Sequence, residues 1–93
     1  MSQFITRVEL HGAQAADYTA LHTAMAAEGF SREITGSTGA VFHLPTAEYA
    51  IMSPLTCEQV REKARKAAAT VRPSFDILVV KSDGAAWQLK QAA

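Results

Sequence analysis

Cysteine is nearly absent from this sequence, and its scarcity excludes several kinds of protein. Cys57 is the only cysteine, which rules out an intramolecular disulfide and a multi-cysteine zinc site and favours a cytoplasmic location. Apolar runs are also short, and none approaches the roughly 18 residues that span a membrane. The first residues lack the basic segment and apolar stretch of a signal peptide. We therefore expect a cytoplasmic protein with no membrane partner.

An excess of charge of one sign is missing as well. Nine Lys and Arg residues balance nine Asp and Glu residues, so no overall field draws the protein to nucleic acid or to an anionic surface. Any contact with RNA must come from a local patch. The sequence also lacks low-complexity tracts, and 48% of its residues are apolar, which is typical of a globular chain. We expect residues 1–93 to form a single domain.

The first segment with a clear period alternates apolar and polar residues, as a half-buried strand does. A helical period follows over residues 14–28, and Gly29 stands where a left-handed residue ends a helix. The predicted strand places Phe4, Thr6, Val8 and Leu10 on one face and Ile5, Arg7 and Glu9 on the other.

Two short strands are expected next, at Phe30–Ile34 and Val41–Leu44. A polar turn with two glycines separates them, so they form a hairpin. Pro45 has no N–H to donate to a sheet, which predicts a bend or bulge before the strand pattern resumes over Ala47–Met52.

The second helix is predicted over residues 57–71, because Thr56 and Gln59 have the spacing of a capping box. A β-branched run, Phe75–Val80, then predicts a strand. Asp83-Gly84 favours a tight turn, so Ala85–Leu89 is a candidate short fifth strand that folds back.

This element order predicts an α+β fold, a ferredoxin-like βαββαβ sandwich with an antiparallel sheet and both helices on one face. The other face, with Ile5, Arg7 and Glu9, is left open unless RNA, a ligand or a second subunit covers it. Trp87 is a candidate for part of that cover. A homodimer is one expected outcome.

Histidines are the first residues to consider for chemistry, since imidazole acts as acid, base or metal ligand near neutral pH. Their spacing matches no metal motif, and we expect neither a metal nor a cofactor. His11 follows the first strand, and Glu9 lies on the same face, so these two form the sharpest local hypothesis; a solvated pair at the sheet rim is the alternative. His22 is interpreted as a helix packing residue, and His43 in the hairpin is ambiguous.

The second helix carries a local excess of positive charge. Arg61, Lys63, Arg65 and Lys66 lie there, and such a cluster binds the phosphates of RNA. The alternative is a solvated helix face on which Glu58 and Glu62 pair with these cations at helical spacings. Charge alone does not separate the two interpretations.

Several segments together resemble a known family. The resemblance covers nearly the whole chain and lies in Thr6–Ala13, Asp17-Tyr18, Leu21-His22, Met25, Glu28–Arg32, His43–Tyr49 and the helix that ends Lys66–Ala69. These segments are similar to the GhoS antitoxins of type V toxin–antitoxin systems. The resemblance implies a ferredoxin-like fold similar to that of the CRISPR adaptation nuclease. It also implies an endoribonuclease that cuts single-stranded RNA with a sequence bias, namely the messenger of a membrane-active toxin.

For such an activity, chemistry suggests catalytic roles for four residues. Arg7 and Arg32 would hold a phosphate or a pentacovalent transition state, and Glu9 or His11 would take the proton of a 2′-hydroxyl. A different class of function stays open: a non-enzymatic, dimeric interaction module or small-ligand-binding module, for which the fold alone suffices.

Overall fold

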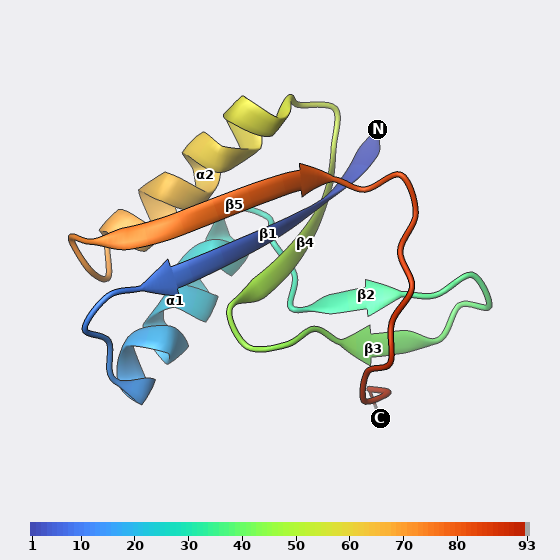
Figure 1. The fold of residues 1–93 in the computed structure, drawn as a ribbon, viewed down its shortest axis with the longest axis horizontal. Coiled ribbons are helices and arrows are strands. Elements are labelled where there is room, and N and C mark those ends of the chain that lie inside the picture. Colours follow the sequence, from blue (N-terminus) through green and yellow to red (C-terminus); the bar gives the residue numbers. More distant parts are fainter. Residues whose placement is uncertain (93) are drawn as a thin grey trace.

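The computed structural model describes residues 1–92 and has the α+β architecture that the element order predicts (Figure 1). Both helices cover the same face of an antiparallel sheet, in which the strand order is β4-β1-β5. The fold is ferredoxin-like. Its elements are β1 (Ser2–Leu10), α1 (Ala15–Ala27), β2 (Glu33–Thr35), β3 (Val41–His43), β4 (Glu48–Ser53), α2 (Cys57–Ala69) and β5 (Phe75–Lys81).

The central strand, β1, has the two faces that its alternation predicts. Phe4, Thr6, Val8 and Leu10 are all buried beneath the helices. Arg7 and Glu9 are exposed on the opposite face. β1 pairs with β4 from Ser2 opposite Ser53 to Arg7 opposite Glu48, and with β5 from Phe4 opposite Lys81 to Leu10 opposite Phe75.

The start of α2 and the end of α1 follow the signals in their sequences, although α2 ends at Ala69, two residues before the predicted end. Thr56 and Gln59 form a reciprocal capping box at the start of α2, with the Gln59 amide 3.1 Å from Thr56 Oγ1. After α1, Gly29 adopts a φ of +95°, and its N–H bonds to the carbonyl of Ala26 while that of Phe30 bonds to Met25. This pair of bonds is a Schellman motif, which directs Phe30 into the core beside Met25.

β2 and β3 form the expected hairpin, with Ile34 opposite Phe42. β2 begins later than predicted because the chain first pairs with β4 at Ser31, which exchanges two 2.8 Å backbone bonds with Ala50. The bend expected near Pro45 is confirmed. Ala47 there has a φ of +69°, and this turn separates β3 from β4.

The segment after β5 differs from the prediction. Residues 85–89 form no strand folded back on β5; the chain runs instead along β3, where Lys90 and Ala92 bond to His43 and Val41. Trp87 packs edge-on against Phe42 at a centroid distance of 5.6 Å. Apolar contact, and not the local turn preference of Asp83-Gly84, therefore decides where this segment lies.

This arrangement gives the sheet a second, smaller apolar cluster on its far face. Ile34, Leu44 and Ala50 are buried in it, and Ile5, Phe42, Trp87 and Leu89 pack against them. The predicted cover of the open face by Trp87 is therefore confirmed, although the cover is partial. Leu78 and Val80 on β5 stay 62% and 47% exposed. Within residues 1–92, no helix is long and apolar enough to cross a membrane.

Candidate active site

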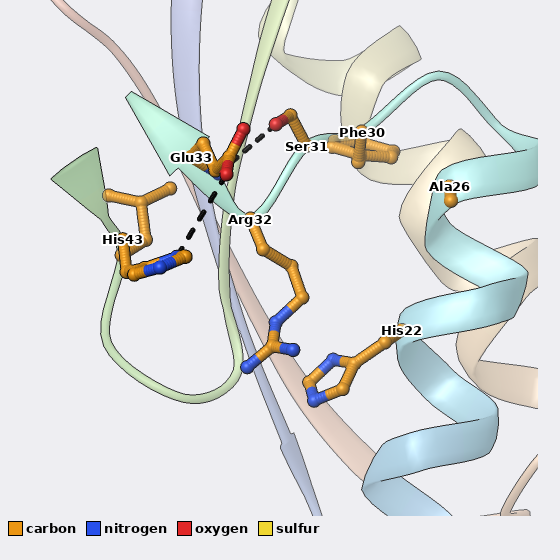
Figure 2. A pocket seen from close by; sticks show the side chains of 8 residues that line it. His22, Ala26, Phe30, Ser31, Arg32, Glu33 and His43 are labelled. Carbon is orange, nitrogen blue, oxygen red and sulfur yellow. Dashed lines mark hydrogen bonds and ion pairs between the residues drawn. The ribbon is translucent and has the colours of Figure 1, made fainter. Parts of the chain in front are cut away.

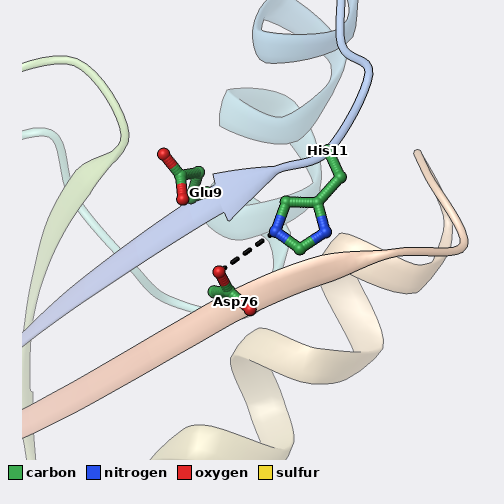
Figure 3. Close-up of side chains that lie close together, drawn as sticks. All are labelled: Glu9, His11 and Asp76. Atoms are coloured by element: carbon green, nitrogen blue, oxygen red, sulfur yellow. Dashed lines mark hydrogen bonds and ion pairs between the residues drawn. The ribbon is translucent and has the colours of Figure 1, made fainter.

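Three polar side chains meet where β1 ends, and we call Glu9, His11 and Asp76 the rim cluster (Figure 3). Glu9 on β1 lies directly opposite Asp76 on β5. His11 follows two residues after Glu9, and its Nε2 is 3.0 Å from Asp76 Oδ2. Its Nδ1 is 2.8 Å from Ser74 Oγ. The imidazole therefore lies beside a carboxylate whose cross-strand neighbour is also acidic.

The rim cluster also has the composition of a cation site. One ligand atom from each of its three residues lies within 4.8 Å of the others. An imidazole nitrogen with two carboxylate oxygens suits divalent first-row metals. All three side chains are exposed, which leaves room for water or a phosphate. The cluster is thus able to hold a cation or to move a proton between imidazole and carboxylate.

The four predicted catalytic residues are divided between two places. Arg7 shares a shallow groove with Glu9 and Asp76, so it lies with the rim cluster. Arg32 does not belong to this groove. It lines a separate cavity of about 600 Å³ that opens between α1 and the β2–β3 hairpin.

We call this cavity the His22 pocket (Figure 2). His22 projects from α1 toward the guanidinium of Arg32, which precedes β2, while His43 comes from β3 on the other side (Figure 2). Glu33 Oε2 is 4.0 Å from His43 Nδ1. The full lining is His22, Ala26, Phe30, Ser31, Arg32, Glu33, His43 and Leu44.

The electrostatics of the pocket keep His22 neutral. Partial burial, followed by the nearby positive charge of Arg32, lowers the pKa of the His22 imidazole below its usual value. His22 Nδ1 is 2.7 Å from the hydroxyl of Tyr49 on β4. Burial raises the pKa of Tyr49 to about 12, against the opposing influence of Arg32. At neutral pH the pocket is thus lined by the uncharged imidazole of His22, which the uncharged phenol of Tyr49 contacts from the core, and by the cation Arg32.

Arg32 is the cation of this pocket, and it forms no ion pair with a carboxylate in the part of the chain that the structure describes. A guanidinium that faces a cavity in this state is suited to a bidentate contact with phosphate. With an imidazole on either side, the pocket contains the groups that phosphodiester cleavage needs: an anion binder, a base and an acid.

A comparison with known protein families agrees with this chemistry. The family model described as Endoribonuclease GhoS matches residues 1–88. The chain belongs to the GhoS endoribonuclease family. Among curated proteins, a search finds no match to the chain. The GhoS match includes every helix and strand of the fold and all the residues of both sites.

In this GhoS family member, the positive charge on α2 is partly neutralised. Lys63 Nζ is 3.4 Å from Glu28, and the Arg65 guanidinium binds the Glu62 carboxylate. The bond to Arg65 lowers the pKa of Glu62 and raises that of Arg65. Arg61 and Lys66 form no ion pair within residues 1–92. Two of the four predicted RNA-binding side chains are thus engaged within the protein.

Sequence reasoning missed Asp76 and Tyr49 and interpreted His22 as a packing residue. Asp76 and Tyr49 lie far along the chain from the histidines that they contact, so no local spacing indicates them. His22 lies on the same helical face as Leu21 and Met25, which are fully buried. Only its position at the margin of that face distinguishes it from a core residue. The hairpin that completes the pocket is also distant in sequence.

Proposed function

We propose that this protein is an endoribonuclease that cuts single-stranded RNA with a sequence bias, and that the reaction takes place in the His22 pocket. Membership of the GhoS family supports an RNA substrate. One observation carries the choice of site: two imidazoles and the guanidinium of Arg32, which has no ion-pair partner among residues 1–92, line one cavity. Arg32 binds the scissile phosphate, and His22 and His43 move protons at the attacking hydroxyl and at the leaving oxygen.

The rim cluster is the second candidate for the catalytic centre. The observation that favours it is the 3.0 Å contact between His11 and Asp76, with Glu9 alongside. Arg7 in the adjoining groove supplies a cation for phosphate. In this version, Glu9 or His11 takes the proton of the 2′-hydroxyl. The two sites make opposite predictions for matched histidine variants.

The deciding experiment measures cleavage of a fluorescently labelled single-stranded RNA by the wild-type protein and by His22→Ala, Arg32→Ala and His11→Ala. We expect the first two variants to lose about 100-fold or more in kcat, the size of effect typical of an acid–base group. His11→Ala is the matched control and keeps wild-type activity. Circular dichroism establishes that each variant is folded.

The opposite result, loss of cleavage in His11→Ala with an active His22→Ala, would move the catalytic centre to the rim cluster. A wild-type protein that leaves single-stranded RNA intact across pH 5 to 9, with and without Mg²⁺ or Mn²⁺, would overturn the ribonuclease proposal itself.

We further propose that the substrate is a toxin-encoding messenger and that the protein acts as an antitoxin in the cytoplasm. The family supports this assignment. A neighbouring short reading frame that encodes one or two apolar helices would supply the candidate RNA. We expect its transcript to be cut faster than a control transcript of equal length. Equal cleavage of the two transcripts would contradict the antitoxin role.

For RNA beyond the cut site, we propose contacts with the basic residues of α2. Arg61 and Lys66 have no ion-pair partner within residues 1–92, whereas Lys63 and Arg65 contact Glu28 and Glu62. The double variant Arg61→Ala/Lys66→Ala should therefore bind RNA more weakly and show a shallower salt dependence. Unchanged affinity at low salt would exclude this surface.

A homodimer is proposed on separate grounds. β5 is an outer strand of the three-stranded sheet, and its Leu78 and Val80 are exposed. Exposed apolar residues on an edge strand favour association with a second strand. Light scattering should show twice the monomer mass, and Leu78→Lys should restore the monomer. A monomer at high concentration would contradict this proposal and with it the alternative of a dimeric, non-enzymatic module.

A further inference from the structure

The contact between His22 and Tyr49 links the pocket to the core of the protein. Tyr49 is fully buried, and its ring packs edge-on against Phe30 at a centroid distance of 6.4 Å. Its hydroxyl is nevertheless in reach of the pocket, 2.7 Å from His22 Nδ1. A ring fixed in this way by packing holds its hydroxyl in one place. His22, by contrast, is only partly buried and projects from the surface of α1.

This hydrogen bond decides which ring nitrogen is available for chemistry. With Nδ1 engaged by the phenol, Nε2 is the nitrogen left to the pocket. The phenol oxygen can accept a hydrogen bond from Nδ1–H in the neutral imidazole, and it accepts a stronger one from the imidazolium. His22 can therefore take a proton at Nε2 and release it again without turning its ring. Tyr49 stays uncharged in this role because its pKa is about 12.

The charged and titratable groups around His22 fit the role of a base. Arg32 and Glu33 come from the segment at the start of β2, His43 from β3 and Tyr49 from β4. Partial burial and, after it, the guanidinium of Arg32 lower the pKa of the His22 imidazole, which favours an unprotonated ring before substrate binds. A bound phosphate would neutralise this guanidinium. The His22 imidazole would then be more basic at the point in the reaction where it takes a proton from the substrate.

We propose that Tyr49 is a positioning residue that presents Nε2 of His22 as the base toward a ribose 2′-hydroxyl, so that the pocket cleaves RNA by internal transesterification. This inference rests on the proposed function and names its chemistry. The 2′-oxygen forms a bond to phosphorus as its proton passes to His22 Nε2. The bond from phosphorus to the 5′-oxygen breaks, and that oxygen takes a proton from the His43 imidazolium. The products carry a 2′,3′-cyclic phosphate and a 5′-hydroxyl.

The first test uses a substrate change. An RNA with a single 2′-deoxynucleotide on the 5′ side of the preferred cut should resist cleavage at that position while it still competes for binding. The unmodified RNA should yield an end with a cyclic phosphate, detected by mass spectrometry. Cleavage of the deoxy-substituted bond, or a 3′-hydroxyl product, would overturn the transesterification.

The second test changes Tyr49 alone. Tyr49→Phe keeps the packed ring and removes the hydroxyl, and we expect kcat to fall by about 10-fold because the imidazole is no longer held in position. The hydroxyl stabilises imidazolium by accepting from Nδ1–H, so its loss should shift the acidic limb of the pH–rate profile to lower pH. Tyr18→Phe is the matched control. It removes the chain's other phenol, which accepts from the Leu10 amide at 3.0 Å, and should leave the acidic limb unchanged.

A readout independent of activity keeps this inference separate from the proposed function. The His22 ring is titrated by NMR in the wild-type protein and in Tyr49→Phe. We expect a lower His22 pKa in the variant, in step with the kinetic shift. An unchanged His22 titration would refute the positioning role even if RNA is cut in the pocket. A wild-type protein without ribonuclease activity but with the shifted titration would refute the proposed function and leave the His22–Tyr49 coupling standing.

Discussion

Thr6 brings a hydroxyl into the main core. The residue is fully buried on β1, and its Oγ1 finds no hydrogen-bond partner within residues 1–92. A buried hydroxyl in this state costs free energy that an apolar group of the same shape does not. Thr6→Val should therefore raise the free energy of unfolding by about 1 kcal/mol. Urea denaturation measures the change.

Thr6→Ala serves as the comparison for this prediction, because it removes the hydroxyl and also leaves a small cavity. We expect it to be less stable than Thr6→Val. If Thr6→Val is less stable than the wild-type protein, the prediction is wrong and the hydroxyl contributes favourably to the free energy of unfolding.

Ala47 occupies a backbone conformation that suits glycine better. Its φ of +69° lies in the left-handed region, where a Cβ is strained by its own backbone. Ala47→Gly should stabilise the protein by about 0.5 to 1 kcal/mol. Ala20→Gly on the exposed surface of α1 should do the reverse, by about 1 kcal/mol. Thermal unfolding should therefore show a higher melting temperature for Ala47→Gly and a lower one for Ala20→Gly than for the wild-type protein.

At this scale, sequence reasoning succeeded where the informative residues were close in the chain. The shared face of Glu9 and His11 follows from the alternation of one strand. Asp76 joins them only through the pairing of β1 with β5, and Tyr49 reaches His22 only because β4 lies beneath α1. The sequence indicates Arg32 as a phosphate binder only through its charge, and its separation from Arg7 depends on the hairpin geometry.

Among the elements, α2 has the most explicit start signal. Thr56 Oγ1 accepts from the Gln59 amide at 3.1 Å, and Gln59 Oε1 accepts from the Thr56 amide at 3.0 Å. Thr56→Ala should cost about 1 kcal/mol of stability, the usual value of an N-cap. Thr23→Ala on the exposed surface of α1 is the matched control and should change stability little. Equal losses in both variants would mean that the capping box contributes nothing specific.

Element boundaries were predicted well where periodicity was long and poorly where it was short. β1, both helices and β5 have enough turns or alternations for the pattern to define them. β2 has three residues, and its start is set by the Ser31–Ala50 bridge and not by its own side chains. The segment at residues 85–89 had a favourable turn before it, yet contact with Phe42 determines its course. A turn sequence permits a hairpin but does not choose its partner.

At the scale of the whole molecule, the sheet has an apolar cluster on each face. The larger one lies under the helices, and the smaller one is closed by the hairpin and by Trp87. Gly36 lies beside this closure, where a Cβ would be 3.4 Å from the indole, an ordinary van der Waals distance. The last part of the chain thus contributes to the stability of the sheet itself.

Trp87→Ala is the test of that contribution. The indole is only partly buried, so we expect a loss of about 1 to 3 kcal/mol, below the range for a fully buried aromatic. Trp87→Phe should recover most of it, because an aromatic ring still packs on Phe42. The free energy of unfolding of both variants can be measured by denaturation, with far-ultraviolet circular dichroism as the probe. Wild-type stability in Trp87→Ala would show that the smaller cluster is only a surface contact.

The central place of β1 has a consequence for synthesis. β1 is made before the other strands, yet its two neighbours, β4 and β5, lie at residues 48–53 and 75–81. While the chain grows from its N-terminus, β1 therefore has neither neighbour until residue 48 has been added, and both only after residue 81. The hydrogen bonds within each helix join residues that are close in sequence. The pairing of β1 with β4 and β5, by contrast, brings together segments that are far apart in the chain. Assembly of the core is thus a late event that follows translation of nearly all of these residues.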